Sequence, residues 1–345
     1  MHEHLPGWKH EVVARHSAGV QAGPAVVRRT RRPTGHASIV ELNLLAVRTG
    51  LRAPPDVILN AHVVTTPAAL LLSQVLRRPV VSYLYADELP GHPRLVRSAC
   101  AGSAGSIAVS GYARDLALAS ASPRAPIHVV LPGIDQVPEN TLPPSLEREP
   151  LLVTVSRLAD RYKGHDVVLR ALPAVLAAVP GARWVIAGDG PLRPDLERLA
   201  SELGLAERVT FVGRLTDAER DQLLDRAAIF VMPSRLPSRG AGGEGFGIAY
   251  LEAALRGVPS VAGDIGGSVD AIIDGETGLL VDATSPEAVA AALIGLLDDE
   301  PRRRQMGLAA WRRARAFTWR RMADEVDTVL QSALGSGRAR WQLSP

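Results

Sequence analysis

Two glutamates flank a glycine-rich turn in the second half of the chain, which reads Glu244-Gly-Phe-Gly-Ile-Ala-Tyr-Leu-Glu252. Gly245 and Gly247 leave room for another molecule at the start of a helix, where unpaired N–H groups favour an anion such as phosphate. With Glu244 just outside the helix and Glu252 about two turns in, the carboxylates lie roughly 12 Å apart at ~1.5 Å per residue. That separation fits a long ligand with a sugar, a pyrophosphate and a ribose.

The same stretch has a simpler explanation. A glutamate before a helix is favoured by the helix dipole, and a glutamate further along can be a solvated residue of an amphipathic helix. The nine residues alone leave both explanations open.

Arg157 and Lys163 carry positive charge on a predicted strand-to-helix loop after the apolar run 151–155. A diphosphate leaving group requires such charges, because negative charge builds on its oxygen as the sugar bond breaks. Lys163 and Lys9 are the only lysines, which weakens the alternative of an exposed pair on a loop. No Asp-x-Asp metal site is evident, so we expect these cations to act in place of a metal ion, with no cofactor.

The composition is that of a soluble globular protein: 345 residues, 46% hydrophobic, 22% charged, formal net charge +3. This length predicts two domains, and no apolar run reaches the ~18 residues of a membrane helix. From the first residues we expect no signal peptide. The single cysteine, Cys100, excludes an internal disulfide and favours a reducing cytoplasm. We read His2, His4 and His10 as a mobile polar end, and the run Arg28–Arg32 as a solvated surface rather than a phosphate or lipid contact.

The elements that position these residues follow a βα alternation, which implies parallel sheets with ligands at the carboxyl ends of the strands. A possible strand at 11–15 precedes a predicted loop at 17–37, and 335–345 is predicted to be a disordered tail. The predicted strands are 56–60, 79–85, 106–110, 128–131, 151–155, 184–187, 209–213, 229–234 and 258–262. The predicted helices are 39–50, 66–76, 92–101, 112–119, 192–203, 217–227, 286–298 and 319–334.

The glutamate pair, the turn between its members and the following Gly257-Val258-Pro259 resemble the paired-glutamate motif of family 4 retaining glycosyltransferases. The resemblance implies a GT-B fold, in which two Rossmann-like domains face a cleft. The chain is similar to the bacterial branch with the phosphatidylinositol mannosyltransferases, over roughly 56–330 and most strongly over 151–300. The family's first strand with its glycine-rich turn is not found, which we interpret as a truncated start or a reduced acceptor domain.

The resemblance divides the chain into four parts. An acceptor-binding Rossmann-like domain covers 1–131, a linker 132–150, a nucleotide-sugar-binding Rossmann-like domain 151–320, and a C-terminal helix and tail 321–345. In GT-B proteins the terminal helix returns to the first domain.

The resemblance also assigns roles to single residues. Arg157 and Lys163 would neutralise the diphosphate, Glu244 would hold sugar hydroxyls, and Glu252 would hold the ribose. The base would lie near Val212-Gly213, a position that serves guanine or uracil. The donor-binding set is Gly188, Gly190, Val212, Gly213, Gly245, Phe246, Gly247, Ile248 and Glu252.

Candidate acceptor contacts stand at strand ends of the first domain: His62, Tyr85 and the acidic pair Asp87 and Glu88. Family members often carry a histidine just after the strand that here ends in Tyr85. His62 is a candidate replacement, although a histidine at a strand end is at least as often a structural hydrogen bonder.

We therefore expect a retaining glycosyltransferase that moves a sugar from GDP-mannose or a UDP-sugar to a hydroxyl on a lipid, glycan or small metabolite. The alternatives are a sugar-nucleotide 2-epimerase of the same fold and a non-catalytic nucleotide-sugar-binding partner. A nicotinamide dehydrogenase is disfavoured, because no strand-linked Gly-x-Gly-x-x-Gly is found. We expect no nucleic-acid partner, and a cytoplasmic protein with peripheral contact to the inner face of the membrane as an option.

Overall fold

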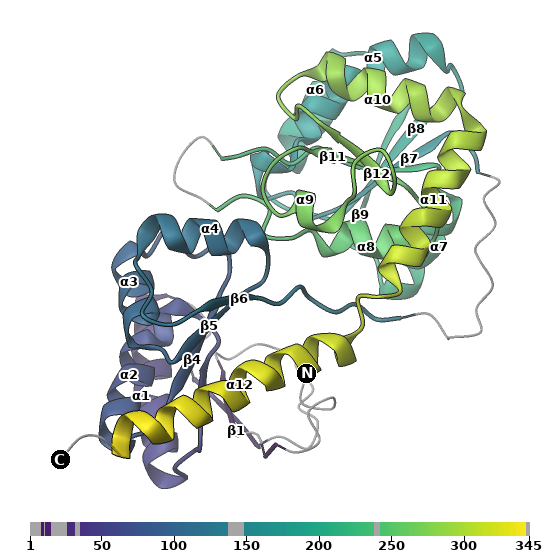
Figure 1. Ribbon diagram of the computed structural model, residues 1–345. Coiled ribbons are helices and arrows are strands. Elements are labelled where there is room, and N and C mark those ends of the chain that lie inside the picture. Colours follow the sequence, from purple (N-terminus) through teal and green to yellow (C-terminus); the bar gives the residue numbers. More distant parts are fainter. Residues whose placement is uncertain are drawn as a thin grey trace. The chain divides into compact units, whose positions relative to one another are not determined.

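The computed structural model describes Trp8, Lys9 and residues 11–14, 26–31, 35–136, 148–237 and 242–342 (Figure 1). The chain forms two compact units. The first comprises Met1–Gly133, Gly240–Gly242 and Trp319–Pro345, and the second comprises Ile134–Arg239 and Gly243–Thr318. The predictions for His2, His4, His10 and most of the linker, at 137–147, lie outside the described residues.

The first unit contains a four-stranded parallel sheet in the order β3-β4-β5-β6. Its strands are β3 (Ile58–Asn60), β4 (Val80–Leu84), β5 (Gly105–Ala108) and β6 (Ile127–Val129). Its helices are α1 (His36–Arg52), the 3-10 turn η2 (Val63–Thr65), α2 (Thr66–Leu76), α3 (Pro93–Gly102), α4 (Gly111–Ser120) and α12 (Trp319–Gln342). The predicted βα alternation is confirmed from α1 to β6.

Alternate side chains of β4 face opposite layers, as the two-residue period of a strand requires. Val81 and Tyr83 belong to an apolar cluster with Val326 of α12, whereas Leu84 packs with Val96 of α3. Helix α12 contacts β4 and β5, so the last helix completes the first unit's core (Figure 1). The helix continues to Gln342, so the predicted disordered tail is wrong over 335–342.

Two predictions near the start have different outcomes. The strand expected at 11–15 is confirmed as β1 (Glu11–Ala14). The loop expected at 17–37 is wrong at β2 (Val26–Arg29), which pairs in parallel with β1. The two valines supply β-forming residues there, and β1 supplies the hydrogen-bonding partner that a short strand needs. Arg28 and Arg29 are exposed.

The second unit contains a six-stranded parallel sheet in the order β12-β11-β10-β7-β8-β9. Its strands are β7 (Leu151–Val155), β8 (Arg183–Ala187), β9 (Val209–Gly213), β10 (Ile229–Met232), β11 (Ser260–Gly263) and β12 (Gly278–Val281). The chain winds outward from β7 through β8 and β9, then returns to the other side of β7 with β10. The strand order therefore reverses between β7 and β10, and ligands of such sheets bind at this switch point.

Helices cover both faces of this sheet. The elements are η3 (Arg161–Lys163), α5 (His165–Ala178), α6 (Arg193–Glu202), α7 (Asp217–Arg226), α8 (Ile248–Leu255), α9 (Ser268–Ala271), α10 (Pro286–Asp298) and α11 (Glu300–Ala314). Helix α5 packs against α6 and α10, and α8 packs against α9 and α11 (Figure 1). Trp184 is fully buried, and its Nε1 donates to Thr154 Oγ1 at 3.0 Å. Trp184 thereby ties β8 to β7 beneath the switch point.

Candidate functional site

The loop after β7 carries Arg157 and is held by the loop after β8. Gly188 has φ +137°, and a Cβ there would lie 1.8 Å from the carbonyl oxygen of Ser156. A Cβ at Gly190 would lie 2.5 Å from the backbone of Leu158. Close packing of the two loops accounts for both glycines, and their predicted contact with a donor stays a prediction.

Lys163 closes the short turn η3, and Gly164 turns the chain into α5. Gly164 has φ +79°, and a Cβ there would lie 2.2 Å from the carbonyl oxygen of Pro233, just after β10. The backbone N–H of Arg235 donates to Tyr162 O at 2.8 Å. These contacts seat the loop after β7 on the segment after β10, across the switch point.

Lys163 and Glu244 meet at this position. Lys163 Nζ lies 2.5 Å from Glu244 Oε2, and the two side chains are only 12% and 10% exposed. Ser234 Oγ lies 3.5 Å from the same carboxylate oxygen. Since the ammonium balances the carboxylate, both charges can stay buried at the carboxyl end of the sheet.

The turn after Glu244 is packed as tightly as the loops around it. Gly267 N–H donates to Glu244 O at 2.7 Å, and a Cβ at Gly267 would lie 2.3 Å from Gly245 O. Phe246 is buried against the ring of Phe317, with centroids 5.9 Å apart. Gly247 precedes α8 with φ +90°, a conformation that only glycine adopts readily. The start of α8 is therefore fixed beside the buried ion pair.

Helix α8 begins later than expected, at Ile248, which is exposed. Glu252 is its fifth residue, so it lies little more than one turn from the start rather than two, and the expected position is corrected. The four residues before Ile248 are held in a loop because positive φ at Gly247 interrupts a helix.

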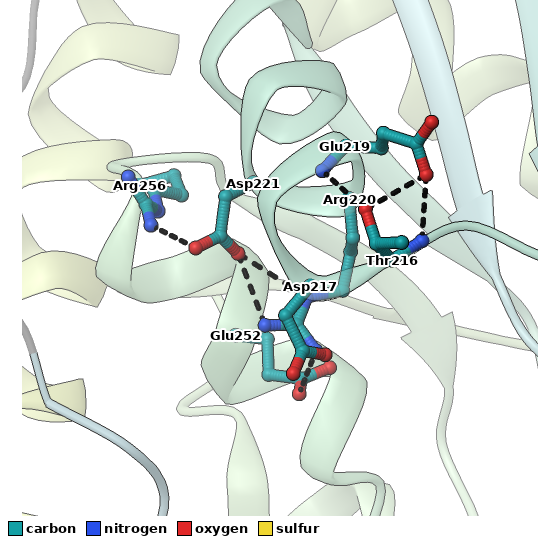
Figure 2. Close-up of polar contacts among 7 residues, drawn as sticks. All are labelled: Thr216, Asp217, Glu219, Arg220, Asp221, Glu252 and Arg256. Atoms are coloured by element: carbon teal, nitrogen blue, oxygen red, sulfur yellow. Dashed lines mark hydrogen bonds and ion pairs between the residues drawn. The ribbon is translucent and has the colours of Figure 1, made fainter.

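Glu252 belongs to a charged network between α7 and α8 (Figure 2). Its Oε1 lies 3.0 Å from Nη1 of Arg220. Arg220 also donates to Asp217 at 2.9 Å and to Asp221 at 3.0 Å, and Asp221 accepts from Arg256. Burial raises the pKa of Glu252, and the attraction of Arg220 opposes that shift. The sequence reasoning missed this partner.

Of the four predicted ligand-binding side chains, the structure brings two together, Lys163 and Glu244. Arg157 is 72% exposed, with Nη2 3.5 Å from Asp160 Oδ2. At β9, Val212 is exposed, and Gly213 O accepts from Gly188 N–H at 2.7 Å.

His165 is a second feature that sequence reasoning missed. Its Nε2 lies 2.8 Å from Ser156 Oγ, next to Arg157, and the residue is 2% exposed. Burial, followed by the charge of Lys163, lowers the pKa of His165 to about 4, so the imidazole is neutral near pH 7. The only signal in the sequence was its place directly after Lys163-Gly164.

The acceptor candidates belong to the first unit. His62 Nδ1 lies 2.6 Å from Glu88 Oε2, so these two are brought together. Tyr85 is 40% exposed, and its ring stacks on Tyr83 at 5.7 Å. Asp87 also has an interaction partner.

Among the described residues, no three histidine, cysteine or carboxylate side chains gather as metal ligands would. Within the same ranges, every helix is too short or too polar to cross a bilayer.

Comparison with known proteins matches residues 141–313 to the family "Glycosyl transferases group 1". The GDP-mannose-dependent alpha-(1-6)-phosphatidylinositol monomannoside mannosyltransferase of Mycolicibacterium smegmatis is 38% identical over 210 residues, covering 58% of this chain and 55% of that protein. The D-inositol 3-phosphate glycosyltransferase of Corynebacterium diphtheriae is 36% identical over 189 residues, covering 53% and 42%. The chain spans about half the length of these curated relatives.

Solved structures share the fold over nearly the whole chain. Sucrose-phosphate synthase from Thermosynechococcus elongatus has a TM-score of 0.79 at 20% identity, covering 96% of this chain and 90% of that one. Anabaena HepE in complex with UDP-glucose has a TM-score of 0.71 at 19% identity, covering 95% and 99%. The likeness confirms the predicted α/β GT-B fold class, and none of these proteins supports the epimerase alternative. Because the family match spans half of the 345 residues, the chain belongs to the group 1 glycosyl transferases, as the glutamate motif indicated.

Proposed function

We propose that the protein is a retaining, family 4 glycosyltransferase that moves a sugar from a nucleotide-diphosphate sugar to an acceptor hydroxyl. The buried pair of Lys163 and Glu244 at the switch point, beside the start of α8, carries the proposal. A cation for phosphate and a carboxylate for sugar hydroxyls stand next to each other there, as cleavage of a sugar–phosphate bond requires.

The donor diphosphate lies, in this proposal, over the N–H groups of Phe246 and Gly247. Lys163 and the exposed Arg157 neutralise the charge that grows on the leaving oxygen. Glu244, held in place by its contact with Lys163, accepts hydrogen bonds from hydroxyls of the transferred sugar. These two cations do the work of a metal ion, so we propose a metal-independent reaction.

Retention of configuration follows from front-face displacement. The bond between the anomeric carbon and the phosphate oxygen breaks while the acceptor oxygen bonds to the same face. The departing phosphate oxygen takes the acceptor proton, so the chain supplies no nucleophile. Gly188, Gly190, Val212 and Gly213 border the nucleotide, and the Glu252 carboxylate holds the ribose.

The relatives guide the choice of substrates to test. The mycobacterial relative is named for GDP-mannose and phosphatidylinositol monomannoside, and the HepE complex contains UDP-glucose. We propose GDP-mannose or a UDP-sugar as donor, and a hydroxyl of a lipid, glycan or small polyol as acceptor.

We also propose a cytoplasmic location with peripheral contact to the inner face of the membrane. One observation supports the contact: Val40, Leu44 and Leu51 are exposed on α1, where an i, i+4, i+11 spacing places them on one face.

A binding and transfer experiment tests the proposal. The purified chain is titrated with GDP-mannose, UDP-glucose, GDP and UDP in a thermal-shift assay, because a ligand of the folded state raises the melting temperature. Transfer is then measured, with the anomeric configuration of the product read by NMR and with EDTA present. We expect one donor to bind, and transfer with retention that survives EDTA.

Lys163→Met is the diagnostic variant, and Lys9→Met, which changes the chain's other lysine, is its matched control. The first should abolish transfer and the second should leave it unchanged. Donor binding without transfer to any acceptor would instead favour the non-catalytic alternative.

A further inference from the structure

A histidine and a buried glutamate form a pair in the first unit. Glu88 is 8% exposed, and its Oε2 lies 2.6 Å from His62 Nδ1. The same oxygen accepts from Val63 N–H at 3.1 Å, and Oε1 accepts from Tyr85 N–H at 3.3 Å. Both carboxylate oxygens are therefore engaged, and the side chain is fixed in place.

The glutamate determines which ring nitrogen of His62 carries the proton. Val64 N–H lies 3.3 Å from Nδ1, and this contact would require a bare nitrogen there. The shorter contact with a carboxylate is the stronger one, so Nδ1 carries the proton and donates to Glu88. In the neutral imidazole, the lone pair is then on Nε2, and the His62 side chain is 53% exposed.

The pair stands where a parallel sheet binds its ligands. Strands β3 and β4 are neighbours with Asn60 paired to Ser82, and His62 and Glu88 follow their carboxyl ends. Asn60 Nδ2 donates to Ser82 Oγ at 3.2 Å and to Thr66 Oγ1 at 3.1 Å, which braces the turn that holds His62. The ring is thus aimed by a rigid support.

A purely structural role explains the buried carboxylate less well. The two backbone N–H groups account for one contact on each carboxylate oxygen, but they do not account for the 2.6 Å contact between Oε2 and His62 Nδ1. The extra charge makes sense if it orients an imidazole, as a carboxylate does for the working histidine of many sites.

We propose that His62, oriented by Glu88, is the residue that binds the acceptor: Nε2 accepts a hydrogen bond from a hydroxyl of a polyol. The inference rests on the proposed function and supplies its acceptor side. His62 does not take the proton of the acceptor hydroxyl. That proton passes to the departing phosphate oxygen, as described above. A lone pair backed by a carboxylate repels anions, so the acceptor presents a hydroxyl here and carries any phosphate elsewhere.

The tautomer is measured first, by NMR of the full chain with 15N-labelled histidine. We expect His62 in the Nδ1–H form, and an Nε2 shift on addition of myo-inositol. Glu88→Gln should populate the other tautomer. His62 in the Nε2–H form, or no shift at saturating myo-inositol, would overturn the inference even if transfer is observed.

Kinetics provide the second arm, with the donor and acceptor found in the transfer screen. His62→Ala should raise the acceptor KM at least tenfold and leave donor binding and donor hydrolysis by water within twofold. Glu88→Gln should move the acceptor KM in the same direction, and His92→Ala, at an exposed histidine before α3, should change nothing. If the acceptor KM of His62→Ala is unchanged, this inference is wrong and the proposed function stands. If the unaltered chain binds no donor, the proposed function is wrong.

Discussion

Replacing His165 by glutamine should change how stability depends on pH. The unfolded chain binds a proton at this histidine below pH 6.5, while the folded protein resists it until about pH 4, because the ring is buried and faces Lys163. Between those values the unfolded state binds more protons, so stability falls as pH falls. Between pH 6.5 and about pH 4 the free energy of unfolding falls by about 3 kcal/mol, at about 1.36 kcal/mol per pH unit.

His165→Gln keeps a group that can hydrogen-bond to Ser156 but does not titrate. At pH 7 the variant should lose about 1 kcal/mol, for an imperfect hydrogen bond and packing. Between pH 7 and pH 4.5 the free energy of unfolding of the unaltered chain falls by about 2.5 kcal/mol because of His165, and that of the variant does not. The variant should therefore be the more stable of the two at pH 4.5.

Urea unfolding followed by circular dichroism at pH 7.0, 6.0, 5.0 and 4.5 measures the difference. His92→Gln is the matched control, because His92 is exposed, and it should follow the unaltered chain. Equal pH slopes for the unaltered chain and His165→Gln would refute the claim that His165 is buried and neutral.

Other variants test separate parts of the second unit. Lys163→Met should lower the free energy of unfolding by about 3 kcal/mol, because it leaves the buried Glu244 carboxylate without its cationic partner. The double variant Lys163→Met/Glu244→Leu should recover part of that loss in a double-mutant cycle. Glu252→Gln should change the free energy of unfolding by less than about 1 kcal/mol, because the cost of burying Glu252 and its attraction to Arg220 offset each other. The variant should bind nucleotide more weakly in calorimetry, and an unchanged affinity would show that Glu252 does not hold the ribose. Gly188→Ala should cost at least about 2 kcal/mol and impair transfer, because its Cβ meets the Ser156 carbonyl, and full thermal stability would contradict that packing.

Most strands and helices could be predicted because their signals are local. Strands β7 and β9 are short apolar runs bounded by polar residues and glycine, and α2 follows a threonine-proline start. Where the local signal was weak the prediction failed. Strand β2 depends on a neighbouring strand for its hydrogen bonds, and the late start of α8 depends on the backbone of Gly247.

The candidate site was predictable in residue type but not in partnership. Lys163 and Glu244 stood out by chemistry, yet we expected each to contact a different part of a ligand, whereas they contact each other. Their pairing depends on strand order, since β10 returns beside β7 in the sheet. His165 and Arg220 escaped notice for the same reason: their partners lie on other elements, and no periodicity within a segment reports such a contact.

The pairing of Lys163 with Glu244 changes the charge available to a donor. Because the ammonium is already balanced by a buried carboxylate, the pair contributes little net charge toward a diphosphate. Of the two predicted phosphate-binding cations, Arg157 has the weaker ion pair: it is 72% exposed, and its contact with Asp160 is long, at 3.5 Å. Under the proposed function, attraction of the donor would therefore depend mainly on Arg157 and the N–H groups at the start of α8, whereas Lys163 would act at short range on the leaving oxygen. Attraction by an exposed arginine is screened by salt, and attraction by a buried lysine is screened much less. In the proposed reaction, Arg157 would therefore serve capture of the donor and Lys163 cleavage of its sugar bond.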